Sequence, residues 1–156
     1  MSPHRQVFTD LVRKSGWTRG AELGVDKGIL FHKLLSTCPE LRLIGVDTCP
    51  IPHRRQRCEA IAEEFAPRAR LYQMTTEAAA DMVAPQSLDF VFIDADHSES
   101  AVALDIARWA PKVRPGGWLG GHDYHQRKWP GVVAAVDRAY GQRVQFWPGT
   151  IWGVTL

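Results

Sequence analysis

Apolar residues recur along this chain in two alternating patterns, short unbroken runs and longer runs at helical spacing. The short runs have the length of buried strands and predict strands over residues 21–24, 41–47, 69–72, 88–94 and 118–121. Helical spacing predicts helices over residues 4–15, 29–35, 53–65, 75–83, 98–110 and 130–140. Because strands and helices alternate, the pattern predicts an α/β fold built on a parallel, doubly wound sheet.

The last part of the chain departs from this alternation. Two apolar segments, Val144–Phe146 and Ile151–Thr155, are joined through Trp147–Thr150, which predicts a closing β-hairpin. Before the fifth strand, Pro115–Gly117 predicts a turn. Nothing marks a linker inside the chain, so we expect a single domain over residues 1–156.

The segment around the first strand combines a strand end, a glycine turn and the start of a helix. Its glycines are Gly20, Gly24 and Gly28, with an acid at Glu22. Glycine lets the chain turn sharply, and the amino end of the next helix adds unpaired N–H groups beside the turn. This spacing is not the G-x-G-x-x-G that binds a dinucleotide, so it argues against NAD.

Acids stand at four of the five predicted strand ends, as Glu22, Asp47, Asp94 and Asp123. In a doubly wound sheet, ligands bind beyond the carboxyl ends of the strands. A single acid there is most simply a helix cap, but four together are harder to explain as caps. Asp47 lies about 20 residues after the glycine turn, where a ribose-binding acid is expected, and its two oxygens can accept from two vicinal hydroxyls.

Composition narrows the classes of function. A net charge of +2 over 156 residues is too small to indicate nucleic acid, and no apolar run approaches the roughly 18 to 20 residues that span a membrane. No apolar signal core follows the N-terminus, so we expect a cytoplasmic protein. Three cysteines without C-x-x-C spacing indicate neither a disulfide framework nor a zinc ribbon, and Cys49, His53 and Cys58 form only a weak candidate metal site.

From about residue 19 onward, the chain resembles class I S-adenosylmethionine (SAM) methyltransferases, and it is most similar to a broad bacterial and phage family of small ones. The segments that carry the resemblance are the glycine turn, Asp89–Ser98, Asp105–Trp109, Arg114–Gly117 and Gly121–Tyr124. The resemblance implies a Rossmann-like, mostly parallel seven-stranded sheet with an antiparallel last strand, in agreement with the predicted hairpin.

The resemblance also implies roles for individual residues. Glu22 and Gly24 would hold the methionine end of SAM and Asp47 its ribose. Met74 and Thr75 would lie at the adenine, and Ile93 and Asp94 along the methionine moiety and the reaction centre.

Relatives that methylate catechols, hydroxycinnamoyl esters and antibiotic sugars bind a divalent cation through an acid ending the fourth strand and an Asp-Asn or Asp-Asp pair ending the fifth. Asp94 matches the first position, and His122 with Asp123 match the pair. A histidine suits Mn, Fe or Zn and fits Mg poorly, so we expect one of these ions rather than Mg. The alternative is that His122 and Asp123 only bond backbone groups after the fifth strand. In the sugar-methylating relatives a base stands two residues after the metal acid, which here is Asp96. Neighbouring acids would raise the pKa of Asp96, and His97 is the alternative base. Both residues have a plain alternative as caps of the helix that follows.

Three functions fit these residues. The resemblance favours a SAM-dependent methyltransferase acting on an oxygen nucleophile, with a metal assisting. A non-catalytic SAM- or nucleoside-binding module is the main alternative, and a metal hydrolase would leave Glu22, Gly24 and Asp47 unexplained.

The sequence does not identify the methyl acceptor. The chain has no lid domain, so either the acceptor is large, or a second subunit or the N-terminal helix completes the pocket. Trp129, in the loop after the fifth strand, is more typical of packing than of acceptor stacking.

Overall fold

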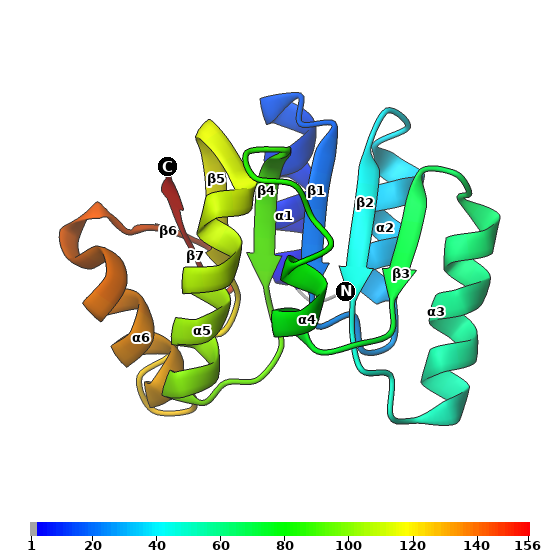
Figure 1. Ribbon diagram of the computed structural model, residues 1–156. Helices are drawn as coiled ribbons and strands as arrows, with labels where there is room; N and C mark the ends of the chain where they lie inside the picture. The colour runs from blue at the N-terminus through cyan, green and yellow to red at the C-terminus, as the bar shows by residue number, and fades with distance from the viewer. Residues whose placement is uncertain (1–2) are drawn as a thin grey trace.

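The computed structural model describes residues 3–156 and contains one seven-stranded sheet in the order β3-β2-β1-β4-β5-β7-β6 (Figure 1). Strands β1 to β5 are parallel, and β7 runs antiparallel to both β5 and β6. This confirms the predicted Rossmann-like sheet and its closing hairpin. The strands are β1 (Arg19–Leu23), β2 (Arg42–Val46), β3 (Ala69–Tyr72), β4 (Leu88–Ile93), β5 (Val113–Gly121), β6 (Gln145–Trp147) and β7 (Ile151–Thr155).

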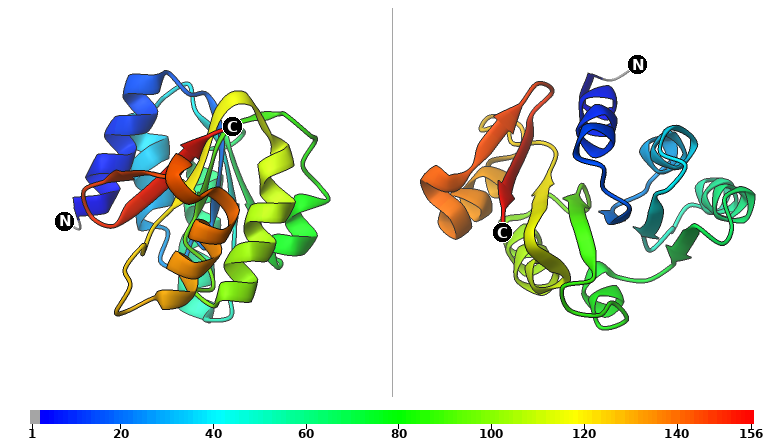
Figure 2. Two further views of the ribbon diagram at one scale, coloured as in Figure 1. Left: turned by 90° about the vertical axis from the view of Figure 1, so that its left-hand side faces the viewer. Right: turned by 90° about the horizontal axis from the view of Figure 1, so that it is seen from above.

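Helices cover both faces of the sheet (Figure 2). One face carries α1 (Pro3–Ser15), α2 (Ile29–Thr37) and α3 (Pro52–Glu64), and the other carries α4 (Thr76–Ala80), α5 (Glu99–Trp109) and α6 (Pro130–Tyr140). Short 3-10 turns, Ala110–Lys112 and Gly141–Arg143, follow α5 and α6. In the part of the chain that the structure describes, no helix combines the length and apolar content needed to cross a membrane.

Strand β4 shows why four consecutive residues, Phe90–Ile93, are apolar. Phe90 and Phe92 pack into the core under α1 and α2, whereas Val91 and Ile93 pack into the core under α5 and α6. Successive side chains of a strand point to opposite faces, so a strand covered on both sides needs apolar residues at every position. These four side chains are at most 4% exposed.

Two segments differ from the sequence-based prediction. The expected turn at Pro115–Gly117 lies inside β5 as a bulge, because the register moves from Leu88 opposite Val113 to Phe90 opposite Trp118. The helix expected over residues 75–83 ends at Ala80. Its predicted cap is confirmed, since the amide of Ala78 donates to the Thr75 hydroxyl at 3.2 Å.

Asp89 ties this bulge to the start of β1. Its Oδ2 accepts from the amides of Thr18 and Arg19 at 2.8 and 2.9 Å, and its Oδ1 accepts from Arg114 Nε at 2.7 Å. Burial alone would raise the pKa of Asp89, but these hydrogen bonds outweigh it and hold the pKa below its ordinary value.

We therefore expect Asp89→Ala to lower the free energy of unfolding by about 1.5 to 3 kcal/mol at neutral pH, the range for hydrogen bonds to a charged group. Because the folded pKa is depressed, this stabilisation is present above the ordinary Asp pKa and is lost as pH falls through the folded value. Urea titrations at pH 7 and near pH 3 measure both effects. Asp81→Ala is the control, since its pair with Arg108 is at the surface and contributes about 0 to 1 kcal/mol. Equal losses in the two variants would contradict this role of Asp89.

Candidate functional site

The turns after β1 and β4 meet at the carboxyl edge of the sheet, the lower edge in Figure 1. Gly24 has φ +88°, and a Cβ built on it would lie 2.1 Å from the carbonyl oxygen of Asp94. Only glycine accepts this conformation and this close approach together. The glycine turn thus brings Glu22 and Asp94, which lie far apart in the sequence, to one place.

Asp47 holds the same turn through backbone hydrogen bonds. Its Oδ2 accepts from the amides of Val25 and Asp26 at 3.0 and 2.9 Å, and its Oδ1 accepts from the Cys49 amide at 2.7 Å. Each carboxylate oxygen has two acceptor positions, so Oδ2 is fully used and Oδ1 has one left. The expectation that Asp47 binds the ribose stays a prediction, and Oδ1 has the acceptor position that is left for it.

Glu22 ends β1 as a buried acid, only 3% exposed, and its Oε2 has no hydrogen-bond partner among the described residues. Burial, with the charges of Asp94 and Asp47, raises its pKa well above the ordinary value, while Arg5 acts in the opposite direction. A buried carboxyl group without a partner is costly to the fold, so its position indicates a ligand that donates to it.

Two adjoining hollows run along this edge, with volumes of about 290 and 450 Å³. Glu22 lines the first, whereas Asp47, Met74 and Thr75 line the second. Gly24, Asp26, Asp94 and Ala95 line both, so the two hollows form one groove.

Ile93, which was expected beside the cofactor, does not line this groove. It is 4% exposed and packs into the core under α5 and α6. It borders a small cavity that Asp94, His97 and His122 also line, so it lies next to the ionisable residues of the site. Its side chain points to the face of β4 that α5 and α6 cover, because successive side chains of a strand alternate between the two faces.

Ionisable side chains gather beside Asp94, where the two hollows meet. His97 Nε2 and Asp123 Oδ2 are hydrogen-bonded at 2.8 Å, and His122 Nδ1 lies 3.3 Å from Asp123 Oδ1 and 3.6 Å from Asp94 Oδ1. Burial works against charge on His122, but hydrogen bonds and charges from Asp123 and Asp94 outweigh it and raise its pKa to about 9. Asp123 is held at φ +61°, a conformation that Asp tolerates better than most residues.

Asp96 does not join this cluster in the expected way. Its Oδ1 accepts from the Ser98 amide at 2.7 Å. This hydrogen bond, together with one from the Ser98 hydroxyl, lowers the pKa of Asp96. The expected raised pKa is therefore wrong. Ser98 itself caps α5, accepting from the Ala101 amide at 3.4 Å. His97 makes no such cap and points to Asp123, so the two candidate bases are distinguished.

Sequence reasoning missed two residues of the site, His4 and Arg5, whereas Trp129 packs as expected. His4 is buried at the start of α1, with its ring centroid 3.8 Å from that of His122, and Arg5 lines the hollow of Glu22. Burial, followed by the charges of His122 and Arg5, lowers the pKa of His4 to about 4. The available signal was that His4 precedes Phe8 by four residues and so shares its buried helix face. Trp129 packs on His97 with ring centroids 4.1 Å apart.

The donor atoms have spacings that fit a metal ion. Four ligands placed about 2.0 to 2.2 Å from an ion in tetrahedral geometry lie about 3.3 to 3.6 Å apart. Of the expected ligand set, Asp94 and Asp123 each show this spacing to His122 Nδ1, but the three residues do not form one compact group of donors among the described residues. Two compact groups of donors share Asp94 in residues 3–156, namely His4–Asp94–His122 and Asp94–His97–Asp123. Nitrogen and oxygen donors together suit Mn, Fe or Zn better than Mg.

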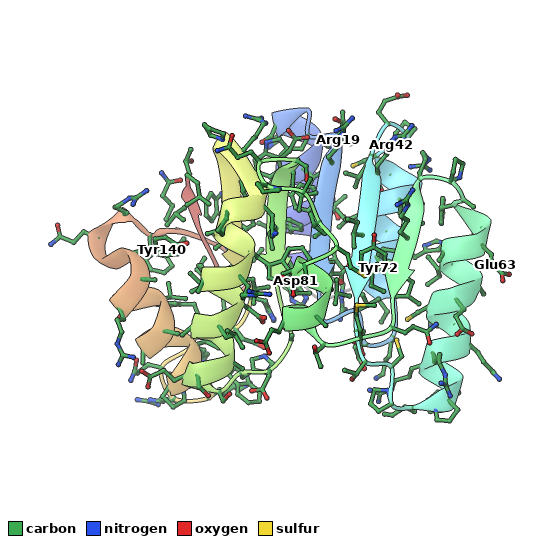
Figure 3. All side chains as sticks on the ribbon, in the orientation of Figure 1. Arg19, Arg42, Glu63, Tyr72, Asp81 and Tyr140 are labelled. Atoms are coloured by element: carbon green, nitrogen blue, oxygen red, sulfur yellow. The ribbon has the colours of Figure 1, made fainter. Side chains whose placement is uncertain are left out.

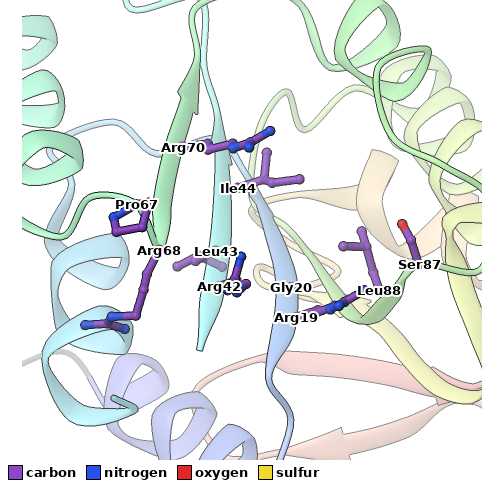
Figure 4. A pocket seen from close by; sticks show the side chains of 10 residues that line it. All are labelled: Arg19, Gly20, Arg42, Leu43, Ile44, Pro67, Arg68, Arg70, Ser87 and Leu88. Atoms are coloured by element: carbon purple, nitrogen blue, oxygen red, sulfur yellow. The ribbon is translucent and has the colours of Figure 1, made fainter. Parts of the chain in front are cut away.

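A further hollow lies at the opposite, amino end of the strands (Figure 4). Arg19, Arg42 and Arg70 surround it, over Leu43 and Leu88. Figure 3 labels Arg19 and Arg42 at this end of the sheet. None of the expected site residues lines it, so it is separate from the groove at the carboxyl edge.

The fold is that of class I SAM-dependent methyltransferases, and solved structures named as O-methyltransferases share it. A family model described as a methyltransferase domain matches residues 21–124, so the chain belongs to this methyltransferase family. A search of curated proteins finds no match.

Solved structures share the fold at low sequence identity. A Corynebacterium glutamicum protein is 20% identical with a TM-score of 0.76, and the match covers 97% of this chain and 79% of that one. CalS11, a TDP-rhamnose 3'-O-methyltransferase of calicheamicin biosynthesis, is 15% identical with a TM-score of 0.74 over 96% and 77% of the two chains. A Podospora anserina methyltransferase solved with S-adenosylhomocysteine (SAH) is 13% identical with a TM-score of 0.71 over 98% and 78%.

We expect Glu22→Gln to weaken SAH binding by tenfold to a hundredfold, because a hydrogen bond to a charged group contributes about 1.5 to 3 kcal/mol. The same variant should be at least as stable as the wild type at pH 8. It removes a buried carboxyl group whose raised pKa destabilises the folded state progressively as pH rises above the ordinary Glu pKa. Titration calorimetry and thermal unfolding measure the two effects, and NAD should not compete with SAH. Glu40→Gln, at an exposed position, is the control. Unchanged SAH affinity in Glu22→Gln would remove Glu22 from the cofactor site.

Proposed function

We propose that this methyltransferase transfers the methyl group of SAM to an oxygen nucleophile, with a divalent cation assisting. The observation that carries the proposal is the cluster of Asp94, His97, His122 and Asp123 beside the groove, at the place where its two hollows meet. Perturbed ionisable groups gather at sites where protons are moved or charge is stabilised.

The groove suggests the direction in which the cofactor lies. Glu22 would accept from the ammonium group at the methionine end, and Arg5 is close enough to neutralise the carboxylate there. Asp47 would accept one ribose hydroxyl through Oδ1, and Met74 with Thr75 would border the adenine. Asp94 then lies between the two ends of the cofactor, beside the reaction centre.

His97 is the residue we assign as the general base. Bound SAM supplies a methyl group on a sulfonium sulfur, and an acceptor oxygen bonds to that carbon as the carbon–sulfur bond breaks and its electron pair passes to sulfur. The acceptor hydroxyl must give up its proton in this reaction. If His97 Nε2 donates to Asp123, the ring presents Nδ1 as a proton acceptor, and Asp123 fixes the tautomer and stabilises the imidazolium that forms.

Asp94, His122 and Asp123 are the residues we assign to the cation. Asp123 can orient His97 and bind the cation at the same time, because its Oδ2 is hydrogen-bonded to His97 while its Oδ1 faces His122. A cation at this place would lower the pKa of an acceptor hydroxyl and hold its oxygen toward the methyl group.

EDTA should abolish methyl transfer, measured with labelled SAM and an acceptor found by screening. Mn, Fe or Zn should restore activity better than Mg, because imidazole is a ligand that these ions accept more readily. His122→Asp should shift the preference toward Mg. Full turnover in EDTA would contradict the cation's role and leave His97 as a metal-free base.

His97→Gln should lower kcat by about 10²- to 10⁴-fold, the usual contribution of a general base, with little change in SAH affinity. Asp96→Asn should have a small effect, because Asp96 is bonded to Ser98. His125→Gln, in the loop beyond β5, is the matched histidine control. If Asp96→Asn loses more activity than His97→Gln, the assignment of the base is wrong. A chain that binds SAH but methylates nothing in the screen would support the non-catalytic alternative.

A further inference from the structure

The amino end of α1 lies at the carboxyl edge of the sheet, beside the groove (Figure 1). His4, in the first turn of this helix, is 8% exposed, and it forms a compact group of donor atoms with Asp94 and His122. All three donor atoms lie within 4.8 Å of one another. The resemblance to known methyltransferases assigned nothing to α1, so this group rests on the structure alone.

The fold holds His4 in this position from two sides. Gly149, in the turn between β6 and β7, packs so closely that a Cβ on it would lie 2.9 Å from the His4 amide nitrogen and 3.0 Å from its Cα. One helical turn further on, Phe8 is fully buried, with its ring centroid 4.1 Å from that of Phe92. The hairpin turn and the core therefore fix where the His4 imidazole lies.

The donor set is chemically specific. Two imidazoles and one carboxylate on the same side of an ion are typical of Fe(II) sites that keep positions open for other ligands. His4 and His122 supply the imidazoles and Asp94 the carboxylate, and Asp123, assigned above to the same cation, has its Oδ1 3.3 Å from His122 Nδ1. Open positions would remain for the acceptor oxygen.

We propose that His4 is a ligand of the divalent cation, so that α1 completes the cation site with a second imidazole. This inference rests on the proposed function, because it concerns the same cation. It also gives α1 a role at both parts of the site, since Arg5, the next residue, lines the hollow of Glu22. The N-terminal helix α1 would then supply two residues, His4 and Arg5, to the site.

The test measures metal binding directly, without turnover. Wild-type protein and His4→Gln, which keeps much of the side-chain volume, are titrated with Zn²⁺ by calorimetry and with Co²⁺ by visible absorption. We expect His4→Gln to bind Zn²⁺ at least tenfold more weakly and to change the Co²⁺ spectrum, because one nitrogen donor is lost. His32→Gln, at an exposed position on α2, is the matched control and should behave as the wild type. Thermal unfolding and SAH affinity verify that His4→Gln is folded.

Wild-type affinity together with an unchanged Co²⁺ spectrum in His4→Gln would overturn the inference. So would a wild-type protein that binds neither ion, although SAM-dependent methylation without a metal could then still hold. Conversely, weaker metal binding in His4→Gln together with full turnover in EDTA would support the His4 ligand and refute the cation's part in the reaction. The two proposals therefore fail by different results.

Discussion

The backbone contact between the turns after β1 and β4 is the constraint on which the rest of the site depends. Gly24 allows its turn to lie directly against Asp94, where any Cβ would be 2.1 Å from a carbonyl oxygen. Asp47 ties the same turn to the end of β2 through the amides of Val25 and Asp26. Glu22, Asp47 and Asp94 therefore share one edge because the backbone leaves no other arrangement. A larger residue at position 24 would separate the cofactor groove from the ionisable cluster.

This edge gathers acids, and the ligands we assign to it are positively charged. Burial and neighbouring acids raise the pKa of Glu22, which means that the carboxylate form is costly when no cation is near. The ammonium and sulfonium groups of SAM and a divalent cation would offset that cost. The amino ends of the same strands carry Arg19, Arg42 and Arg70 instead. The two hollows thus differ in the side chains that line them, because arginines surround the one at the amino end and acids with bases line the groove at the carboxyl edge.

Much of this architecture follows from the sequence, because apolar runs with acids after them locate buried strands and their ends. The strand Leu88–Ile93 and the acid Asp94 are examples, as is the hairpin that closes the sheet. Local backbone geometry is the part that the sequence does not show. Three acceptor positions of Asp47 are taken by amides of the neighbouring turns, and this depends on how those turns fold. Ile93 faces the core because of strand alternation, which the resemblance did not take into account. His4 was missed because a polar residue on a buried helix face breaks the apolar pattern and so looks like the helix end.

A crystal structure with SAH and Mn²⁺, recorded with anomalous scattering, tests the central claim that one groove at the carboxyl edge holds the cofactor with its reaction centre beside the histidine and aspartate cluster. The account predicts the SAH amino group within hydrogen-bond distance of Glu22, the adenine at Met74, and an anomalous peak between Asp94 and His122. SAH bound in the reverse direction, SAH in the arginine-lined hollow, or a Mn²⁺ peak away from Asp94 would contradict it.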